Sequence, residues 1–428
     1  FATTNLRKIN KLQEAGGVIR KNGLGINFGG GMDSDLPEFN YLKEVDYVSG
    51  ASMILTRKLW DEVEGFSLDY DFAYYEDVDL AFKIRDKGYK VVYQPKSVVV
   101  HFEGVSHGDT EGRGLKKYQL ENRKRFYMKW VDTLKKESCK NDLDLFWARD
   151  RSRDKKTILV IDHYVPRYDM DAGSRTMFQY LKLFVEMGFN VKFLGDDFCR
   201  EEPYTSMLQQ LGVEVLYGDF YKKNWRKWLK DHGDNIDFVY LNRACVSIKY
   251  IDFVKKCTDA KITYNAVDFS YLREQRQYEV SGDKQFLIAA ENSKKLEFDM
   301  FKKSDVIITI SEYEKDLLKE EMPKKKIHVI PTFIYDESRY GLTGGFFDRK
   351  DITFVGGFNH KPNVDGILWF VNEVFPGLRE ILPSIKLNVV GSNPPSEVLE
   401  LNADDINVTG FVSDEELKKY YECSRLVI

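Results

Sequence analysis

Short apolar runs alternate with amphipathic stretches from residue 157 to the end of this chain, and this alternation constrains the possible fold most strongly. The run TILVI at residues 157–161 has four consecutive apolar residues after its threonine, which is typical of a strand buried on both faces of a sheet. Apolar side chains then recur at helical spacing between residues 177 and 185, and Gly188 provides a helix stop. Strands and helices in alternation predict a parallel sheet covered by helices. Further strands are expected at residues 190–194, 238–241, 262–264 and 306–310.

The same pattern begins again near residue 352. Two successive Rossmann-like units, joined near residues 331–349, would leave a deep cleft between them. Ligands of open α/β sheets bind outside the carboxyl ends of the strands, so we expect the ligand there. The expected strands of the second unit are residues 352–355, 387–390, 406–408 and 426–428, with helices beginning at Pro362 and spanning residues 414–423.

Composition excludes several classes of protein. The 428 residues carry 64 Lys and Arg against 68 Asp and Glu, a net charge of −4, so no nucleic-acid partner is expected. No apolar run is long enough to span a membrane. The five cysteines are scattered without a C-x-x-C pair, which favours a reducing cytoplasm and argues against a structural zinc site. A large α/β enzyme remains.

Four parts can be distinguished along the chain. Residues 1–137 open with a glycine-rich stretch, residues 138–156 form a highly charged linker, and residues 157–335 and 345–428 are the two Rossmann-like units. The chain begins with Phe and ends within an apolar strand pattern. We therefore expect both ends to be cut, so that a missing motif does not count against a function.

The first part contains a cluster of carboxylates at the expected start of a helix. Glu76, Asp77 and Asp79 fall within four residues, where negative charge meets the free N–H groups and the dipole of a helix. These carboxylates either cap the helix or include a base for a hydroxyl nucleophile. His101 follows the run VVV, and it is either a structural residue or a ligand of a divalent cation.

Together, several motifs of the first part resemble the acceptor-side half of an inverting family-2 glycosyltransferase of the GT-A fold. The resemblance implies that Asp77 is the catalytic base, that His101 binds the Mg or Mn ion on the nucleotide diphosphate, and that Glu76 and Asp79 support the acceptor site or cap the helix. The family's D-x-D motif is absent, because residues 33–35 (DSD) lie in a loop rather than at a strand end. The motifs are VDYVSGAS at 45–52, GFS at 65–67, YEDVDL at 75–80, GY at 88–89 and VHFEGVS at 100–106.

The later parts contain turns that could approach a ligand. GSR at residues 173–175 is either a turn with an N-cap or a backbone contact to a ligand. Two glycines follow the strand at 352–355, where the backbone could approach a phosphate. The G-x-G-x-x-G fingerprint is missing, which disfavours a dehydrogenase or a nucleotide-dependent epimerase.

With further motifs at residues 329–331, 389–392 and 408–412, residues 157–428 resemble a retaining family-4 glycosyltransferase of the GT-B fold. The resemblance places Gly356, Gly357 and Phe358 beside the donor sugar nucleotide, and Gly173, Ser174 and Arg175 on the acceptor side. It also suggests that Asp268 is a polar catalytic residue, although Asp268 could equally cap a helix. A GT-B enzyme needs no metal cofactor.

The expected fold class is therefore α/β: the C-terminal part of a GT-A domain followed by a GT-B transferase with an incomplete second Rossmann-like domain. The expected function is transfer of sugars from nucleotide-sugar donors to a growing surface polysaccharide, of O-antigen or capsule type, on a glycan or lipid-linked glycan. The alternative is that only one module is catalytic and the other binds the acceptor or acts as a scaffold in a synthase complex. We expect a cytoplasmic protein. A lipid-linked acceptor would be compatible with peripheral association of the protein at the inner face of the cell membrane.

Overall fold

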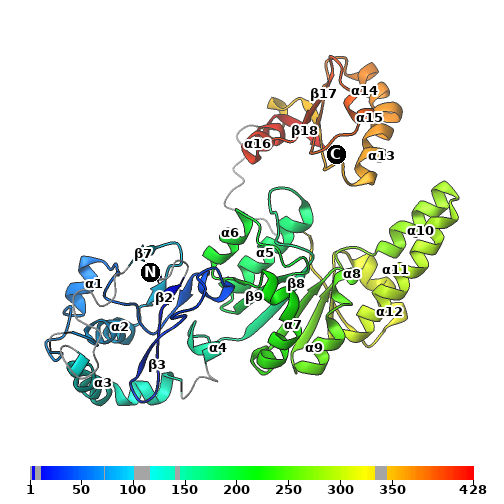
Figure 1. The fold of residues 1–428 in the computed structure, drawn as a ribbon. Helices are drawn as coiled ribbons and strands as arrows, with labels where there is room; N and C mark the ends of the chain where they lie inside the picture. Colours follow the sequence, from blue (N-terminus) through cyan, green and yellow to red (C-terminus); the bar gives the residue numbers. More distant parts are fainter. Residues whose placement is uncertain (1, 5–10, 72, 101–115, 140–144, 333–344) are drawn as a thin grey trace. The chain divides into compact units, whose positions relative to one another are not determined.

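The computed structural model describes residues 2–4, 11–71, 73–100, 116–139, 145–332 and 345–428 (Figure 1). The chain divides into two compact units. Residues 1–166 and 177–332 form the first unit, and residues 167–176 and 333–428 form the second. Each unit is described by itself.

A sheet of seven parallel strands forms the centre of the first unit. Its strand order is β10-β9-β8-β11-β12-β13-β14, so the direction of winding reverses between β8 and β11. That reversal is the topological switch point of a doubly wound sheet. The strands are β8 (Thr157–Asp162), β9 (Asn190–Gly195), β10 (Glu214–Val215), β11 (Phe238–Asn242), β12 (Lys261–Asn265), β13 (Val306–Thr309) and β14 (Lys326–Val329).

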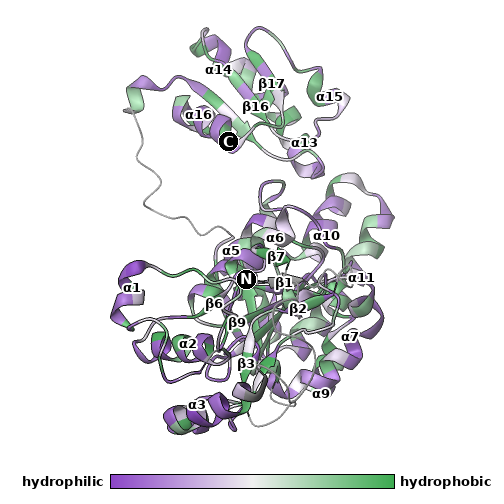
Figure 2. Cartoon of the chain, turned by 60° about the vertical axis from the view of Figure 1, so that its left-hand side comes forward, coloured by the Kyte–Doolittle hydropathy of each residue, from purple (hydrophilic) through white to green (hydrophobic). Residues whose placement is uncertain are grey.

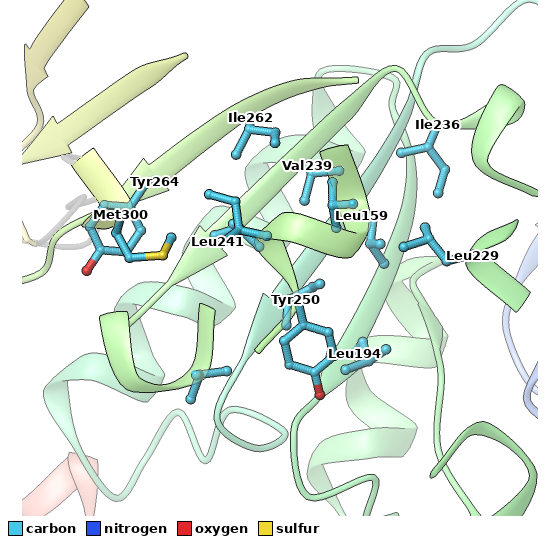
Figure 3. Close-up of a cluster of buried hydrophobic side chains, with 14 of the residues drawn as sticks. Leu159, Leu194, Leu229, Ile236, Val239, Leu241, Tyr250, Ile262, Tyr264 and Met300 are labelled. Carbon is cyan, nitrogen blue, oxygen red and sulfur yellow. The ribbon is translucent and has the colours of Figure 1, made fainter. Parts of the chain in front are cut away.

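Both faces of this sheet are covered, as the apolar runs predict. Successive side chains of a strand point to opposite faces, so Leu159 and Ile161 enter one core and Ile158 and Val160 enter another. Figure 3 shows part of the first core, with Leu159 and Leu194 near Tyr250. In Figure 2 the strand β9 is apolar in colour, while helices such as α7 and α9 carry polar residues.

Helices of two groups pack on this sheet. The core that contains Leu159 includes residues of α7 (Asp219–His232), α9 (Ile251–Cys257) and α11 (Lys284–Lys303), and the core that contains Ile158 includes residues of α5 (Ala172–Glu186) and α6 (Tyr204–Leu211). Within the described residues, no helix has the length and apolar character needed to cross a membrane. The remaining helices of this part are α8 (Ala244–Ser247), α10 (Ser270–Ser281) and α12 (Glu312–Glu321).

The second unit repeats the doubly wound pattern on a smaller scale. Its four parallel strands have the order β17-β16-β15-β18, and its core includes Ile352, Ile367, Phe375 and Leu387. The two parallel sheets confirm the expected α/β class. The elements are β15 (Asp351–Val355), α13 (Lys361–Trp369), α14 (Phe375–Ile381), β16 (Leu387–Val390), α15 (Ser396–Leu399), β17 (Ile406–Gly410), α16 (Asp414–Cys423) and β18 (Ser424–Val427).

The first part of the chain forms several small sheets around its own core. A three-stranded sheet has the order β2-β1-β7, and two antiparallel pairs, β3-β4 and β5-β6, lie beside it. The helix α3, which the sequence pattern did not reveal, contributes Phe126 and Leu134 to the core. The elements are β1 (Ala2–Thr4), β2 (Leu12–Glu14), β3 (Gly17–Ile19), β4 (Gly25–Asn27), β5 (Lys43–Glu44), α1 (Arg57–Glu62), α2 (Glu76–Asp86), β6 (Val92–Tyr93), β7 (Val98–Val100) and α3 (Lys116–Glu137).

The charged segment expected to be a linker is largely buried where it is described. After α4 (Leu145–Ala148), Arg149 forms a bidentate ion pair with Glu214 of β10, at 3.0 and 2.8 Å. Lys192 of β9 lies between Asp150 and Glu214, at 3.1 and 2.6 Å, and its side chain has no exposed surface. The hydroxyl of Tyr41 also donates to Asp150, at 2.8 Å. We call these five residues the ionic junction, because they join the first part of the chain to the parallel sheet.

Charge compensation keeps the carboxylates of the ionic junction ionised. Burial alone would raise the pKa of Asp150, but Lys192 and Arg149 outweigh it and lower that pKa to about 2. Burial likewise opposes ionisation of Glu214, and the same two cations lower its pKa. Arg149 and Asp150 are thus buried against the sheet, whereas Arg153, Asp154 and Lys156 of the same segment are exposed.

Candidate functional site

The predicted base, Asp77, lies in the first turn of α2. Its two carboxylate oxygens accept from the backbone N–H groups of Gly50 and Val78, each at 2.8 Å. Burial raises the pKa of Asp77, and these N–H groups oppose the rise. The carboxylate is thus fixed in orientation while its basicity is increased, which are two properties that a general base requires.

A second carboxylate, Glu14, lies next to Asp77 and was not expected from the sequence. Glu14 ends β2, is almost completely buried, and accepts from the N–H of Ser49 at 3.1 Å. Burial raises the pKa of Glu14 to about 7, the Ser49 N–H opposes this, and the charge of Asp77 raises it further. The neighbouring N–H groups of Ser49 and Gly50 therefore hold two different carboxylates in one turn. We call Glu14, Asp77 and this turn the carboxylate pair site.

Glu76 and Asp79 have different surroundings from each other. Glu76 is half-buried, burial raises its pKa, and its Oε2 has no hydrogen-bond partner. Asp79 has no exposed surface, and it accepts from Trp130 Nε1 at 2.6 Å, Lys129 Nζ at 2.9 Å and the Tyr70 hydroxyl at 3.0 Å. Asp79 thus connects α2 to α3, and because it is enclosed by protein groups we do not include it in the proposed acceptor site.

The expected metal ligand, His101, lies outside the described residues. Within the part of the chain that the structure describes, no three His, Cys, Asp or Glu side chains gather closely enough to hold a metal ion.

A polar cluster lies at the switch point of the seven-stranded sheet. Asp162, at the end of β8, accepts from Asn242 Nδ2 at 2.8 Å and from Arg243 Nε at 3.1 Å. Asn265, at the end of β12, donates to Asn242 Oδ1 at 3.1 Å. Arg243 has a φ of 63° and Val267, just beyond β12, has a φ of 54°. Such left-handed residues cost about 1–3 kcal/mol each and often occur at functional sites.

The sequence contained a signal for this switch-point cluster. Asp162, Asn242 and Asn265 each follow an apolar run directly, and the carboxyl ends of parallel strands meet at one edge of a sheet. Polar residues that end neighbouring parallel strands therefore indicate a common cluster at that edge.

The predicted residues near this sheet mostly stabilise local structure. Ser174 donates through its N–H and its hydroxyl to Asp171, at 2.8 and 2.7 Å, and Arg175 Nε donates to the carbonyl of Tyr168 at 3.1 Å. Gly173 lies beside them in the first turn of α5. The turn with an N-cap, one of the two readings of this motif, is thus present.

Asp268 is about half exposed and forms an ion pair with Arg273 of α10. This pair fastens Asp268 to the helix that follows it. Glu297 of α11 accepts from the N–H of Ser270 at 2.8 Å and is nearly fully buried, and burial raises its pKa to about 7. Two carboxylates, Asp268 and Glu297, therefore lie at the start of α10. Of these, the sequence predicted only Asp268 as a candidate site residue.

The ends of β15 and β16 pack closely because Gly391, after β16, and Gly356, after β15, have no Cβ atom. A Cβ atom on Gly391 would lie 1.9 Å from the carbonyl oxygen of Gly356, and the side chain of Asn363 donates to the carbonyl of Gly357 at 2.9 Å. Phe358, expected beside the donor, is buried in the core of the second unit. The structure accounts for Gly356 and Phe358 by packing, and Gly357 remains at the carboxyl edge of the sheet.

No model of a protein family matches the sequence, and a search of curated proteins finds no relative. Solved structures similar to this chain include a sucrose-phosphate synthase from Thermosynechococcus elongatus, with 13% identity and a TM-score of 0.44 over 64% of this chain and 75% of that one. The complex of S. aureus MnaA with UDP has 11% identity and a TM-score of 0.39 over 64% and 73% of the two chains. The glycotransferase of kitacinnamycin has 12% identity and a TM-score of 0.33 over 60% and 71%.

Proposed function

We propose that this chain is a glycosyltransferase that moves sugars from nucleotide-sugar donors to a growing surface polysaccharide of O-antigen or capsule type. The first part would transfer one sugar with inversion, and the two Rossmann-like units would transfer another with retention. The observation that carries the proposal is the carboxylate pair site, where Asp77 is oriented by two N–H groups and made more basic by burial.

In this mechanism Asp77 takes the proton from the acceptor hydroxyl as that oxygen attacks the anomeric carbon of the donor. The bond to the diphosphate breaks, and inversion follows from attack on the opposite face. Glu14 is nearly inaccessible to solvent, and burial together with the charge of Asp77 raises its pKa to about 7, so we assign it no direct part in the proton transfer. A divalent ion held through His101 remains part of the proposal, and it would neutralise the leaving diphosphate.

For the second transfer, the proposal places the acceptor near the switch-point cluster. The carboxyl edge of a doubly wound sheet is where ligands bind, and the strained Arg243 and Val267 lie there. Asp268 remains the expected polar catalytic residue, and Gly357 the expected donor contact. We propose no metal for this second transfer, because helix N-termini and basic side chains can neutralise the diphosphate.

The decisive experiment measures nucleoside diphosphate release and sugar transfer with a panel of UDP-, GDP- and dTDP-sugars, with and without Mg²⁺ or Mn²⁺. Asp77→Asn should lower one of two transfer activities by about 10²–10⁴-fold, because an amide cannot act as the base. Asp61→Asn on α1 is the matched control, since Asp61 is an exposed carboxylate paired with Arg57. Asp268→Asn tests the other activity in the same way.

Full transfer by Asp77→Asn would remove Asp77 as the base. If the wild-type chain binds donors or glycans but transfers neither sugar, the alternative of an acceptor-binding or scaffold protein would be favoured. If Asp77→Asn and Asp268→Asn both lose the same one transfer activity, a single catalytic module would be supported.

A further inference from the structure

The loop before Asp77 contains two consecutive residues in a conformation that is rare for side-chain-bearing residues. Tyr74 and Tyr75 have φ angles of 74° and 77°, and Tyr75 precedes the first residue of α2. A helix usually begins from a residue with extended backbone angles, so this start is unusual. Such a turn persists only where the surrounding structure enforces it.

One buried side chain enforces this turn. The Nδ2 of Asn122 donates to the carbonyl oxygens of Asp71, Ala73 and Tyr74, at 3.1, 3.0 and 3.1 Å. Its Oδ1 lies 3.4 Å from the N–H of Asp71, and the residue has no exposed surface. The amide of Asn122 thus binds the carbonyls of two residues just before the left-handed tyrosines and of Tyr74 itself.

Asn122 belongs to one stripe of α3 that contacts α2 along its length. Phe126, one turn later, packs against Tyr75 with ring centroids 5.3 Å apart, and Lys129 and Trp130 bind Asp79. These residues recur at the spacing of one helix face. The hydroxyl of Tyr75 also donates to the carbonyl of Gly23 at 2.8 Å. The Asp77 carboxylate therefore lies between two fixed points, the left-handed turn and Asp79.

We propose that Asn122 is a positioning residue for Asp77: its amide selects the left-handed turn that directs the Asp77 carboxylate onto the N–H of Gly50. The catalytic consequence rests on the proposed function of Asp77 as a base. The geometric consequence does not, because the hydrogen bond from Gly50 to Asp77 can be measured without any substrate.

The test compares wild type with Asn122→Ala in two independent measurements. Hydrogen–deuterium exchange of a peptide covering residues 48–52 reports the Gly50 N–H, and it should become at least roughly tenfold faster when Asp77 moves away. In the transfer assay, kcat of the first part's reaction should fall about 100-fold while KM for the donor changes little, since misplacement of a base affects the chemical step. The other transfer reaction should be unchanged. Asn224→Ala on α7 is the matched control, because its amide donates to one exposed backbone carbonyl.

A second variant separates positioning from a general loss of packing. Glycine adopts positive φ without strain, so Tyr74→Gly combined with Asn122→Ala should recover most of the lost exchange protection and activity. Unchanged hydrogen exchange in Asn122→Ala would overturn the proposal, whatever the transfer assay shows. The proposal would also be overturned if Asn122→Ala lost both transfer reactions equally and Tyr74→Gly recovered neither. Faster exchange together with full transfer by Asp77→Asn would leave the positioning role standing and reject the proposed function.

Discussion

Replacing Lys192 in the ionic junction should strongly destabilise the first unit. Its ammonium group lies 3.1 Å from Asp150 and 2.6 Å from Glu214, with no exposed surface. In Lys192→Met, the two buried carboxylates Asp150 and Glu214 lose one of the two cations that compensate them, and Arg149 must compensate both. Breaking one partner of a buried pair typically costs about 3–5 kcal/mol, and we expect a loss of that size in the free energy of unfolding.

Urea unfolding followed by circular dichroism at pH 7.5 would measure this loss. Lys182→Met is the matched control, because Lys182 and Glu186 form an exposed pair on α5 at 3.6 Å, for which a change within about 0.5 kcal/mol is expected. The penalty of Lys192→Met should shrink as pH falls toward 5, since protonation of Asp150 removes the uncompensated charge. It should also shrink when Asp150→Asn is added, because the two residues are coupled. A loss below about 1 kcal/mol relative to the control would refute the argument that the junction depends on charge compensation.

Two further predictions concern Glu14 and Gly391. Because burial raises the pKa of Glu14 from 4.5 to about 7, the folded state binds its proton more tightly, and this stabilisation is lost as pH rises through that interval, by about 3 kcal/mol in total. Glu14→Gln should therefore flatten the decline in unfolding free energy between pH 5 and 8, and identical pH profiles for the two proteins would contradict the assigned burial effect. Gly391→Ala should destabilise the second unit by about 1–3 kcal/mol or more, because its Cβ would collide with the Gly356 carbonyl. Limited proteolysis of residues 345–428 would detect this, and Gly366→Ala, where a Cβ meets no atom within 4 Å, should leave the proteolysis rate unchanged or lower it.

Most strands of the parallel sheets were predictable from the sequence because they are apolar runs, and β8 and β9 are buried at every position. The short strand β10 and the partly exposed strand β14 were not expected. Each apolar run, such as residues 157–161 or 352–355, corresponds to an observed strand. The helix α3 was not predicted, because its buried apolar residues, Phe126 and Leu134, are two turns apart among charged side chains. Most of its contacts with α2 use polar or aromatic groups, which a hydrophobic pattern does not identify.

The candidate site was predictable only in part. Asp77 could be proposed from its local motif, since a helix start is recognised within a few residues. Glu14 and Asn122 come from distant positions in the chain, and only the tertiary fold brings them near Asp77. A lone glutamate after a short strand carries no local signal of a raised pKa, because burial is what raises it.

The ionic junction has a practical consequence for separating the two halves of this chain. A protein shortened to begin at Thr157 would retain Lys192 and Glu214 inside the sheet but lose Arg149, Asp150 and Tyr41. Cutting the chain at residues 138–156 would thus leave the buried charges of Lys192 and Glu214 without their partners from the first part. A hybrid protein in which residues 1–156 are exchanged should keep the whole ionic junction. Otherwise Lys192 and Glu214 should be replaced with apolar residues of similar volume.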